Sequence, residues 1–110
     1  MITQRKIKER VAESIKPKVE VRRPTMYKVV LINDDYTPMD FVVNLLERFF
    51  YLSEEVAITT MLQIHNQGKG VCGVFTHEIA ETKVFQVTKW AQIHEYPLLC
   101  CMEPDNLPLL

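Results

Sequence analysis

The fold is decided by residues 27–39, which read YKVVLINDDYTPM. The first six residues are aromatic, apolar or β-branched apart from one lysine, which predicts a β-strand. The next four, NDDY, have the composition of a loop. A helix start follows, with Thr37 as the N-cap, Pro38 at the first helical position and Asp40 in the first turn. This stretch therefore predicts a strand that delivers polar side chains to one end of a sheet, next to a helix N-terminus.

Helix and strand signals continue along the rest of the chain. Helices are predicted from Thr37 to about residue 50, from Ser53 to the stop at Gly68, and over about 78–94. Strands are predicted over 70–76 and 98–102. The predicted order is β-α-α-β-α-β, which indicates an α+β domain. Its three helices pack on one face of a small three-stranded antiparallel sheet, as a two-layer sandwich.

Length and composition indicate one globular domain. The chain has 110 residues, of which 47% are hydrophobic and 25% charged. No apolar run approaches the roughly 18 residues that cross a membrane, and the start lacks a secretory signal pattern. We therefore expect a cytoplasmic protein without a membrane partner. We expect three parts: a flexible basic N-terminal extension over 1–24, a core domain over 25–104 and a loose C-terminal tail over 105–110.

The distribution of charge argues against nucleic acid as a partner. Residues 1–24 hold eight Lys/Arg and three Glu, whereas the remainder holds five Lys/Arg and eleven Asp/Glu. A basic segment alone is compatible with phosphate binding, but the acidic body would repel phosphate. No known nucleic-acid motif accompanies the basic segment.

Enzyme, metal and cofactor patterns are missing from the sequence. The cysteines and histidines, which are Cys72, Cys100, Cys101, His65, His77 and His94, have no paired metal-ligand spacing. The sequence has no GxSxG and no phosphate-binding loop. We therefore expect a binding module that is not an enzyme and needs no cofactor or metal.

The loop after the first predicted strand has two possible roles. Asn33 and Asp35 project to the same side of an extended segment and could together grip an ammonium group. The alternative is an Asx-rich turn that only caps the next helix. His65, on the second predicted helix, gains interest only if that helix lies against this loop.

The apolar positions of the first two predicted helices are also open to two interpretations. Met39, Val42, Met61 and Ile64 are typical of a core, but flexible methionines also line adaptable pockets. A further alternative is a receiver-type phosphoacceptor domain, because Asp34 and Asp35 follow a strand. That fold requires more strands than this chain provides.

Several blocks of the sequence resemble the ClpS family, the adaptors of the bacterial Clp protease. Residues 26–42, MYKVVLINDDYTPMDFV, are similar to the family signature, and the likeness continues in the blocks at 67–69, 72–76, 78–84 and 97–100. It covers about residues 25–103. The family fold is a three-stranded sheet with three helices, in agreement with the order predicted above.

The resemblance implies a function and a set of residues for it. Family members bind proteins with an N-terminal Phe, Tyr, Trp or Leu and hand them to the ClpA unfoldase of the ClpAP protease. For this chain, the resemblance implies that the α-amino group is contacted by Asn33, Asp34, Asp35 and His65. It implies a side-chain pocket lined by Thr37, Met39, Val42, Met61, Ile64 and Leu98. It also implies that the unfoldase is contacted by Glu78 and Lys83. Ile64 replaces the valine often found at that position, which would trim the pocket slightly. The rival functions are an interaction domain of this fold without a pocket and the receiver-type domain.

Overall fold

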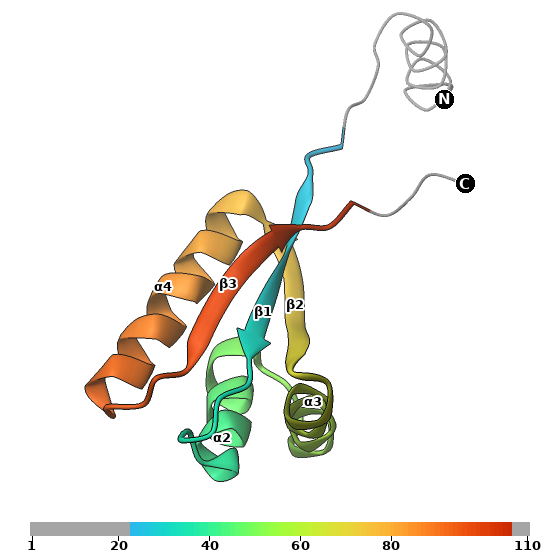
Figure 1. Cartoon of the computed structure of the whole chain (residues 1–110). Coiled ribbons are helices and arrows are strands. Elements are labelled where there is room, and N and C mark those ends of the chain that lie inside the picture. Colours follow the sequence, from blue (N-terminus) through green and yellow to red (C-terminus); the bar gives the residue numbers. More distant parts are fainter. Residues whose placement is uncertain (1–22, 107–110) are drawn as a thin grey trace, which may run out of the picture.

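The structure, a computed structural model, describes residues 23–106. Its elements are β1 (Met26–Ile32), α2 (Met39–Phe50), α3 (Glu54–Gln67), β2 (Lys69–Thr76), α4 (His77–Ile93) and β3 (Leu99–Pro104), as shown in Figure 1. The order is β-α-α-β-α-β, so the sequence-based prediction of the element order is confirmed. The extension predicted over 1–24 lies outside the described residues up to position 22.

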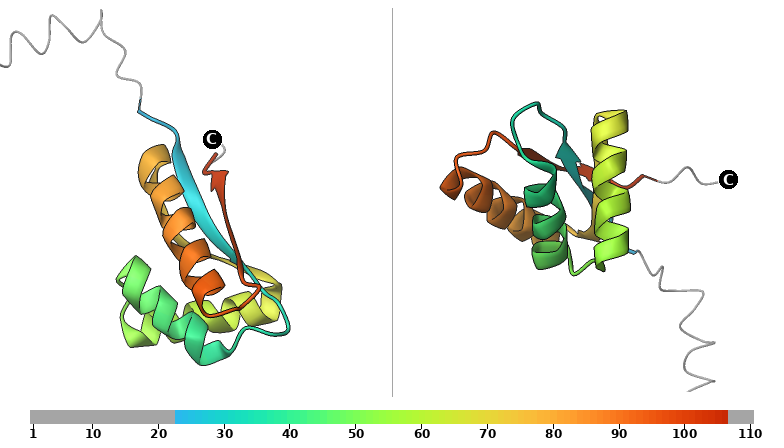
Figure 2. Two further views of the ribbon diagram at one scale, coloured as in Figure 1. Left: turned by 90° about the vertical axis from the view of Figure 1, so that its left-hand side faces the viewer. Right: turned by 90° about the horizontal axis from the view of Figure 1, so that it is seen from below.

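The three strands form one antiparallel sheet in the order β2-β1-β3. The helices cover one face of this sheet. Helix α4 runs along the strands, while α2 and α3 lie at the end where β1 finishes (Figure 2). This confirms the predicted two-layer arrangement. It also places the polar loop that follows β1 beside α2 and α3.

The core forms between the sheet and the helices. Strand alternation directs Val29 and Leu31 toward the helices, and both are fully buried. The apolar face predicted for the first helix needs a correction. Met39 is 46% exposed instead of buried, and Leu45 and Phe50 join the core in its place. The periodicity of apolar residues predicted the helix correctly. It did not predict which residues at the margin of the apolar face are buried, because that depends on where α3 and α4 pack.

The ends of the first two helices are set by local chemistry. Ser53 caps α3 by accepting a hydrogen bond from Val56 N–H, and Gly68 ends it with φ of 88°, as predicted. The prediction for α2 was wrong by one residue, because Pro38 occupies the N-cap position and Thr37 precedes it. The Thr37 hydroxyl does not cap the helix because it donates to the Asp34 carboxylate instead.

Strand β2 contains a bulge where it passes the middle of β1. Val29 pairs with Gly73 and Val30 with Val71, so Cys72 is an extra residue on β2. Over residues 23–106, no helix combines the length and apolar character needed to cross a bilayer.

Candidate functional site

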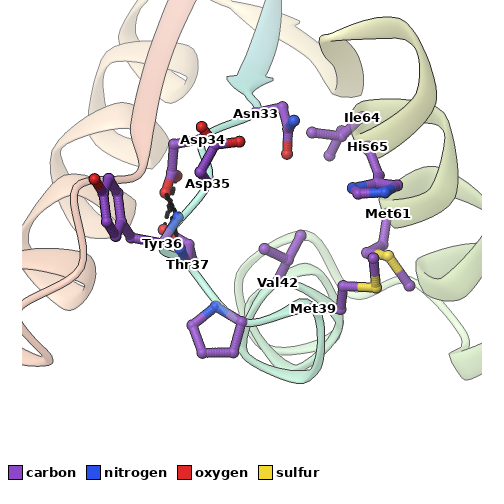
Figure 3. A pocket seen from close by; sticks show the side chains of 11 residues that line it. Asn33, Asp34, Asp35, Tyr36, Thr37, Met39, Val42, Met61, Ile64 and His65 are labelled. Atoms are coloured by element: carbon purple, nitrogen blue, oxygen red, sulfur yellow. Dashed lines mark hydrogen bonds between the residues drawn. The ribbon is translucent and has the colours of Figure 1, made fainter.

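A cavity of about 340 Å³ lies at the carboxyl end of β1, between the following loop, α2 and α3. Its size falls in the range of small-ligand sites. Figure 3 shows the side chains around it. Polar groups from the loop and from α3 line one part, and methionine and branched apolar side chains line the other. The lining residues are Asn33, Asp34, Asp35, Tyr36, Thr37, Pro38, Met39, Val42, Met61, Ile64 and His65.

The end of α3 is fastened directly to the end of β1. Asn33 N–H donates to the Gly68 carbonyl at 2.9 Å, and Gly68 N–H donates to the Ile64 carbonyl at 2.9 Å. Gly68 adopts a left-handed conformation that favours glycine. These bonds hold the last turn of α3 against the loop. The condition that gave His65 a possible role, a helix lying against Asn33–Asp35, is therefore met.

Asp34 organises the loop. Its Oδ1 accepts hydrogen bonds from Tyr36 N–H and Thr37 N–H, both at 2.8 Å, and its Oδ2 accepts from the Thr37 hydroxyl at 2.7 Å. Partial burial alone would raise the pKa of Asp34, but the hydrogen bonds from Thr37 and Tyr36 outweigh burial and hold it below its usual value. At neutral pH the carboxylate is therefore charged and tied into the loop.

The remaining polar side chains of the cavity have free acceptor capacity. Within residues 23–106, no side-chain hydrogen bond engages Asn33, Asp35 or His65. Figure 3 shows Asn33 and His65 on neighbouring sides of the cavity, with Asp35 on the loop beyond Asn33. An amide oxygen, a carboxylate and a neutral imidazole nitrogen are all acceptors. Their grouping suits a guest that carries several N–H donors and a positive charge.

The apolar part of the cavity is a continuation of the core. Val42, Met61 and Ile64 are nearly buried, with 6%, 9% and 3% of their surface exposed. Met39, which is half exposed, stands at the rim beside Met61 (Figure 3). A side chain that entered between these groups would lose water on several sides, while the methionines could adjust to its shape.

The residues predicted for the α-amino site all line the cavity, and so do all but one of those predicted for the side-chain pocket. Leu98 is 5% exposed, packs in the core and does not line the cavity. Tyr36 and Pro38 do line it, although neither was predicted to be a site residue. Their position inside the 33–39 stretch was the available signal.

Glu78 and Lys83 lie on α4, away from the cavity. Glu78 is exposed in the first turn of the helix. The Lys83 ammonium donates to the Phe49 carbonyl at 2.7 Å and lies 4.9 Å from the centre of the Tyr51 ring. Lys83 thus fastens α4 to the end of α2, a contact that sequence analysis did not foresee.

The described residues contain no cluster of metal ligands, and two of their three thiols are held in the unreactive, protonated form. No cluster of three or more His, Cys, Asp or Glu residues within 23–106 is arranged to hold a metal ion. Burial raises the pKa of the Cys72 and Cys100 thiols to about 12. Both are therefore protonated at neutral pH, and a protonated thiol is a poor nucleophile.

Known proteins of one family are similar to this chain over most of its length. A family model described as ATP-dependent Clp protease adaptor protein ClpS matches residues 22–101. The ATP-dependent Clp protease adapter protein ClpS of Rhodospirillum centenum is 55% identical over 91 residues, which cover 83% of this chain and 84% of that protein. The protein of the same description from Vibrio cholerae is 58% identical over 88 residues, covering 80% and 83%.

A solved structure is also similar over the described region. It is the structure of Agrobacterium tumefaciens ClpS2 bound to L-phenylalaninamide. It matches this chain with a TM-score of 0.73 and 40% sequence identity, covering 76% of this chain and 100% of that one. Both the fold and the sequence relationship therefore extend over nearly the whole described domain.

Proposed function

Because this chain belongs to the ClpS family of Clp protease adaptors, we propose that it captures proteins by an N-terminal Phe, Tyr, Trp or Leu and delivers them to the ClpAP protease. The observation that carries this proposal is the two-part cavity at the end of β1. Its polar acceptors lie beside an apolar recess that continues the core. An N-terminal residue with a bulky apolar side chain has the matching two parts.

The polar part explains how a chain terminus is distinguished from an internal residue. A free α-amino group has a pKa near 8 and is mostly an ammonium at neutral pH, with up to three N–H donors. The Asn33 oxygen, a neutral His65 nitrogen and the Asp35 carboxylate accept these donors. An internal peptide nitrogen has one N–H and no charge, so it would cover these acceptors from water and leave some of them unsatisfied, which is costly.

Asp34 contributes differently from its neighbours. Three of its roughly four acceptor positions are occupied within the loop. Its contribution to ammonium binding is therefore mainly the nearby negative charge, together with the fixed position of Asn33 and Asp35. Asp34 thus belongs to the α-amino site chiefly as the residue that holds it in shape.

The apolar part selects for size and shape. Thr37, Met39, Val42, Met61 and Ile64 enclose the guest side chain. Charged hydrogen bonds contribute about 1.5–3 kcal/mol each, and burial of a Leu or Phe side chain adds a similar amount, about 1.5–3 kcal/mol. After the cost of association, an affinity in the range of about 1 μM is expected, which permits both capture and release.

Delivery uses another part of the molecule. We propose that Glu78 and Lys83 on α4 face the N-terminal domain of ClpA and that residues 1–24 take part in transfer of the substrate. The protein works in the cytosol as an adaptor, without catalysis, metal or cofactor, and without a nucleic acid or membrane partner. Lys83 acts there partly by holding the corner between α2 and α4, because its ammonium is bonded to the Phe49 carbonyl.

A pair of fluorescent peptides tests the proposal. Two peptides that start with Leu and differ only in N-acetylation are titrated with the full chain, and binding is followed by fluorescence anisotropy. We expect the free peptide to bind and the acetylated peptide not to bind. Equal binding of both, or of neither, would favour an interaction domain of the same fold that lacks this specificity. Phosphorylation of Asp34 or Asp35 by acetyl phosphate would instead favour the receiver-type domain.

A further inference from the structure

Gly70 lies directly behind one wall of the cavity. A β-carbon at position 70 would lie 2.7 Å from Ile64 Cγ1 and 3.6 Å from Ile64 Cδ1. Carbon atoms in favourable contact lie about 3.5–4.0 Å apart, so the first of these distances leaves no room for an alanine. Ile64 is 3% exposed and lines the cavity. The absence of a side chain at position 70 therefore makes room for a cavity-lining residue.

Backbone conformation does not account for the glycine at this position. Gly68 is the only glycine with positive φ in the part of the chain that the structure describes. Gly70 lies in β2, where it pairs with Leu31 of β1. An alanine could adopt this extended backbone without strain. The requirement at position 70 is space for Ile64.

An Ile64 side chain displaced from Gly70 has few places to go. On the core side it meets buried residues such as Leu31, which is fully buried, and protein interiors contain few voids. Ile64 lines the cavity of about 340 Å³, whereas it does not line the hollow of about 240 Å³ that Gly70 borders on the other side. A side chain added at position 70 would therefore push Ile64 toward the space that receives the guest.

We propose that Gly70 determines the size selectivity of the cavity by letting Ile64 lean away from the guest side chain. This inference rests on the proposed function and adds to it a residue that does not itself contact the guest. It also revises the expectation that isoleucine trims the pocket. The longer arm of Ile64, Cγ1 and Cδ1, lies over Gly70, so its extra carbon is accommodated behind the wall instead of in front of it.

Four variants test this inference in the full-length chain. Gly70→Ala is the main change and Ile64→Val removes Cδ1. In the double variant Gly70→Ala/Ile64→Val a γ-carbon still meets the new β-carbon, but the side chain pushed toward the cavity lacks Cδ1 and therefore occupies less of it. Gly73→Ala is the matched control: it lies in the same strand, and its β-carbon would be 2.6 Å from Phe75, which does not line the cavity. Each variant is titrated with Leu-, Phe- and Trp-starting peptides and their acetylated forms.

Selectivity, not overall affinity, is the decisive quantity. Gly70→Ala should weaken binding of the Phe and Trp peptides about five- to tenfold more than binding of the Leu peptide. The double variant should return the ratio most of the way to that of the original protein, because the displaced side chain is one carbon shorter. Gly73→Ala should lower the thermal midpoint without changing the ratio. An unchanged ratio in Gly70→Ala, or no recovery in the double variant, would overturn the inference while leaving the proposed function standing.

A second measurement decides the question even if no peptide binds. Methyl NMR of the free protein reports contacts between the Ile64 δ-methyl and the ε-methyls of Met39 and Met61 across the cavity. In Gly70→Ala these contacts should strengthen, because Ile64 moves into the cavity. Unchanged contacts would mean that β2 shifts outward instead, which contradicts the inference. Failure of the original protein to bind any free peptide would count against the proposed function separately.

Discussion

The two ends of β1 differ in what surrounds them. At the carboxyl end, Asn33 is bonded to Gly68 of the α3 terminus, and Asp34 makes three hydrogen bonds within a loop that lines the cavity. At the amino end, Asp105 N–H donates to the Met26 carbonyl at 2.7 Å, and the Tyr27 ring meets His77 edge-on. Figure 1 shows the chain entering β1 at this second end, near the start of α4.

The difference suggests, under the proposed function, that the two ends of β1 serve different steps: substrate binding at the carboxyl end and delivery at the amino end. The strand has seven residues, so its two end residues are six steps of about 3.3 Å, or about 20 Å, apart. The carboxyl end has a preorganised pocket, and preorganisation lowers the cost of binding. The amino end is where residues 1–24 join the core, and the exposed Glu78 lies nearby on the first turn of α4. Under the proposed function, substitutions should therefore alter capture and delivery separately.

Removal of the N-terminal extension should have the largest effect, and only on delivery. A chain that starts at Thr25 keeps the cavity and the whole core, so its affinity for a Leu- or Phe-starting peptide should change less than twofold. Degradation of a Leu-starting substrate by ClpAP should fall to the rate without adaptor. An unrelated tail of the same length should restore most of the delivery. Loss of peptide binding would contradict the separation, because it would make residues 1–24 part of the pocket.

Two histidines at opposite ends of β1 provide the next comparison. His65→Ala removes an acceptor from the cavity and should weaken peptide binding at least about tenfold, the effect of one charged hydrogen bond. The thermal midpoint should hardly change, because His65 is exposed and makes no side-chain hydrogen bond within residues 23–106. His77→Ala, the control, removes contacts to Tyr27 and Glu81 and should leave peptide affinity unchanged. Equal losses of peptide affinity in the two histidine variants would contradict the proposal that peptide binds only at the carboxyl end of β1.

Two adjacent aspartates should separate loop stability from ligand binding. Asp34→Asn removes the charge of a carboxylate that accepts three hydrogen bonds. It should lower the free energy of unfolding by about 1 kcal/mol at pH 7. Because folding lowers the pKa of Asp34, its stabilisation is complete above the unfolded pKa near 3.9 and is lost as pH falls through the lower folded value. The difference in stability between the variant and the original protein should therefore shrink as pH falls below the unfolded pKa and vanish once Asp34 is protonated in the folded protein, as measured by chemical denaturation.

Asp35→Asn is the matched control for this measurement. Asp35 is exposed and its carboxylate makes no hydrogen bond in the described region, so stability should be unchanged. Peptide affinity should fall instead, because the variant loses the charge that is proposed to face the α-amino group. A loss of stability from Asp35→Asn as large as that from Asp34→Asn would show that the loop does not divide these roles.

The sequence predicted the elements well because their signals are local. Ser53 and Gly68 marked the ends of α3 through capping and left-handed geometry, which depend on a few neighbouring residues. The start of α2 was misplaced by one residue because the Thr37 hydroxyl has two possible partners. Composition cannot decide between capping the helix and bonding to Asp34, and the structure shows the second.

Part of the candidate site could be predicted from the sequence, because that part also depends on local signals. The run 33–39 stood out as a polar loop between a strand and a helix. His65 and the apolar positions of the two helices were also noticed, but only the resemblance to a known family assigned them to a pocket. Exposure of Met39, burial of Leu98 in the core and the bond from Lys83 to Phe49 depend on packing between distant elements. The space behind Ile64 likewise needs β2 and α3 to be placed together.

The most direct test of the separation between the two ends is chemical-shift mapping on the full-length, ¹⁵N-labelled protein. A Phe-starting peptide is added while backbone amide signals are followed, with its acetylated form as the control. The largest changes should fall in residues 33–39 and 61–68, with little change at Met26, Tyr27 or residues 76–81. Changes centred on the start of α4, or equal changes with the acetylated peptide, would contradict capture of a free N-terminus at the carboxyl end of β1.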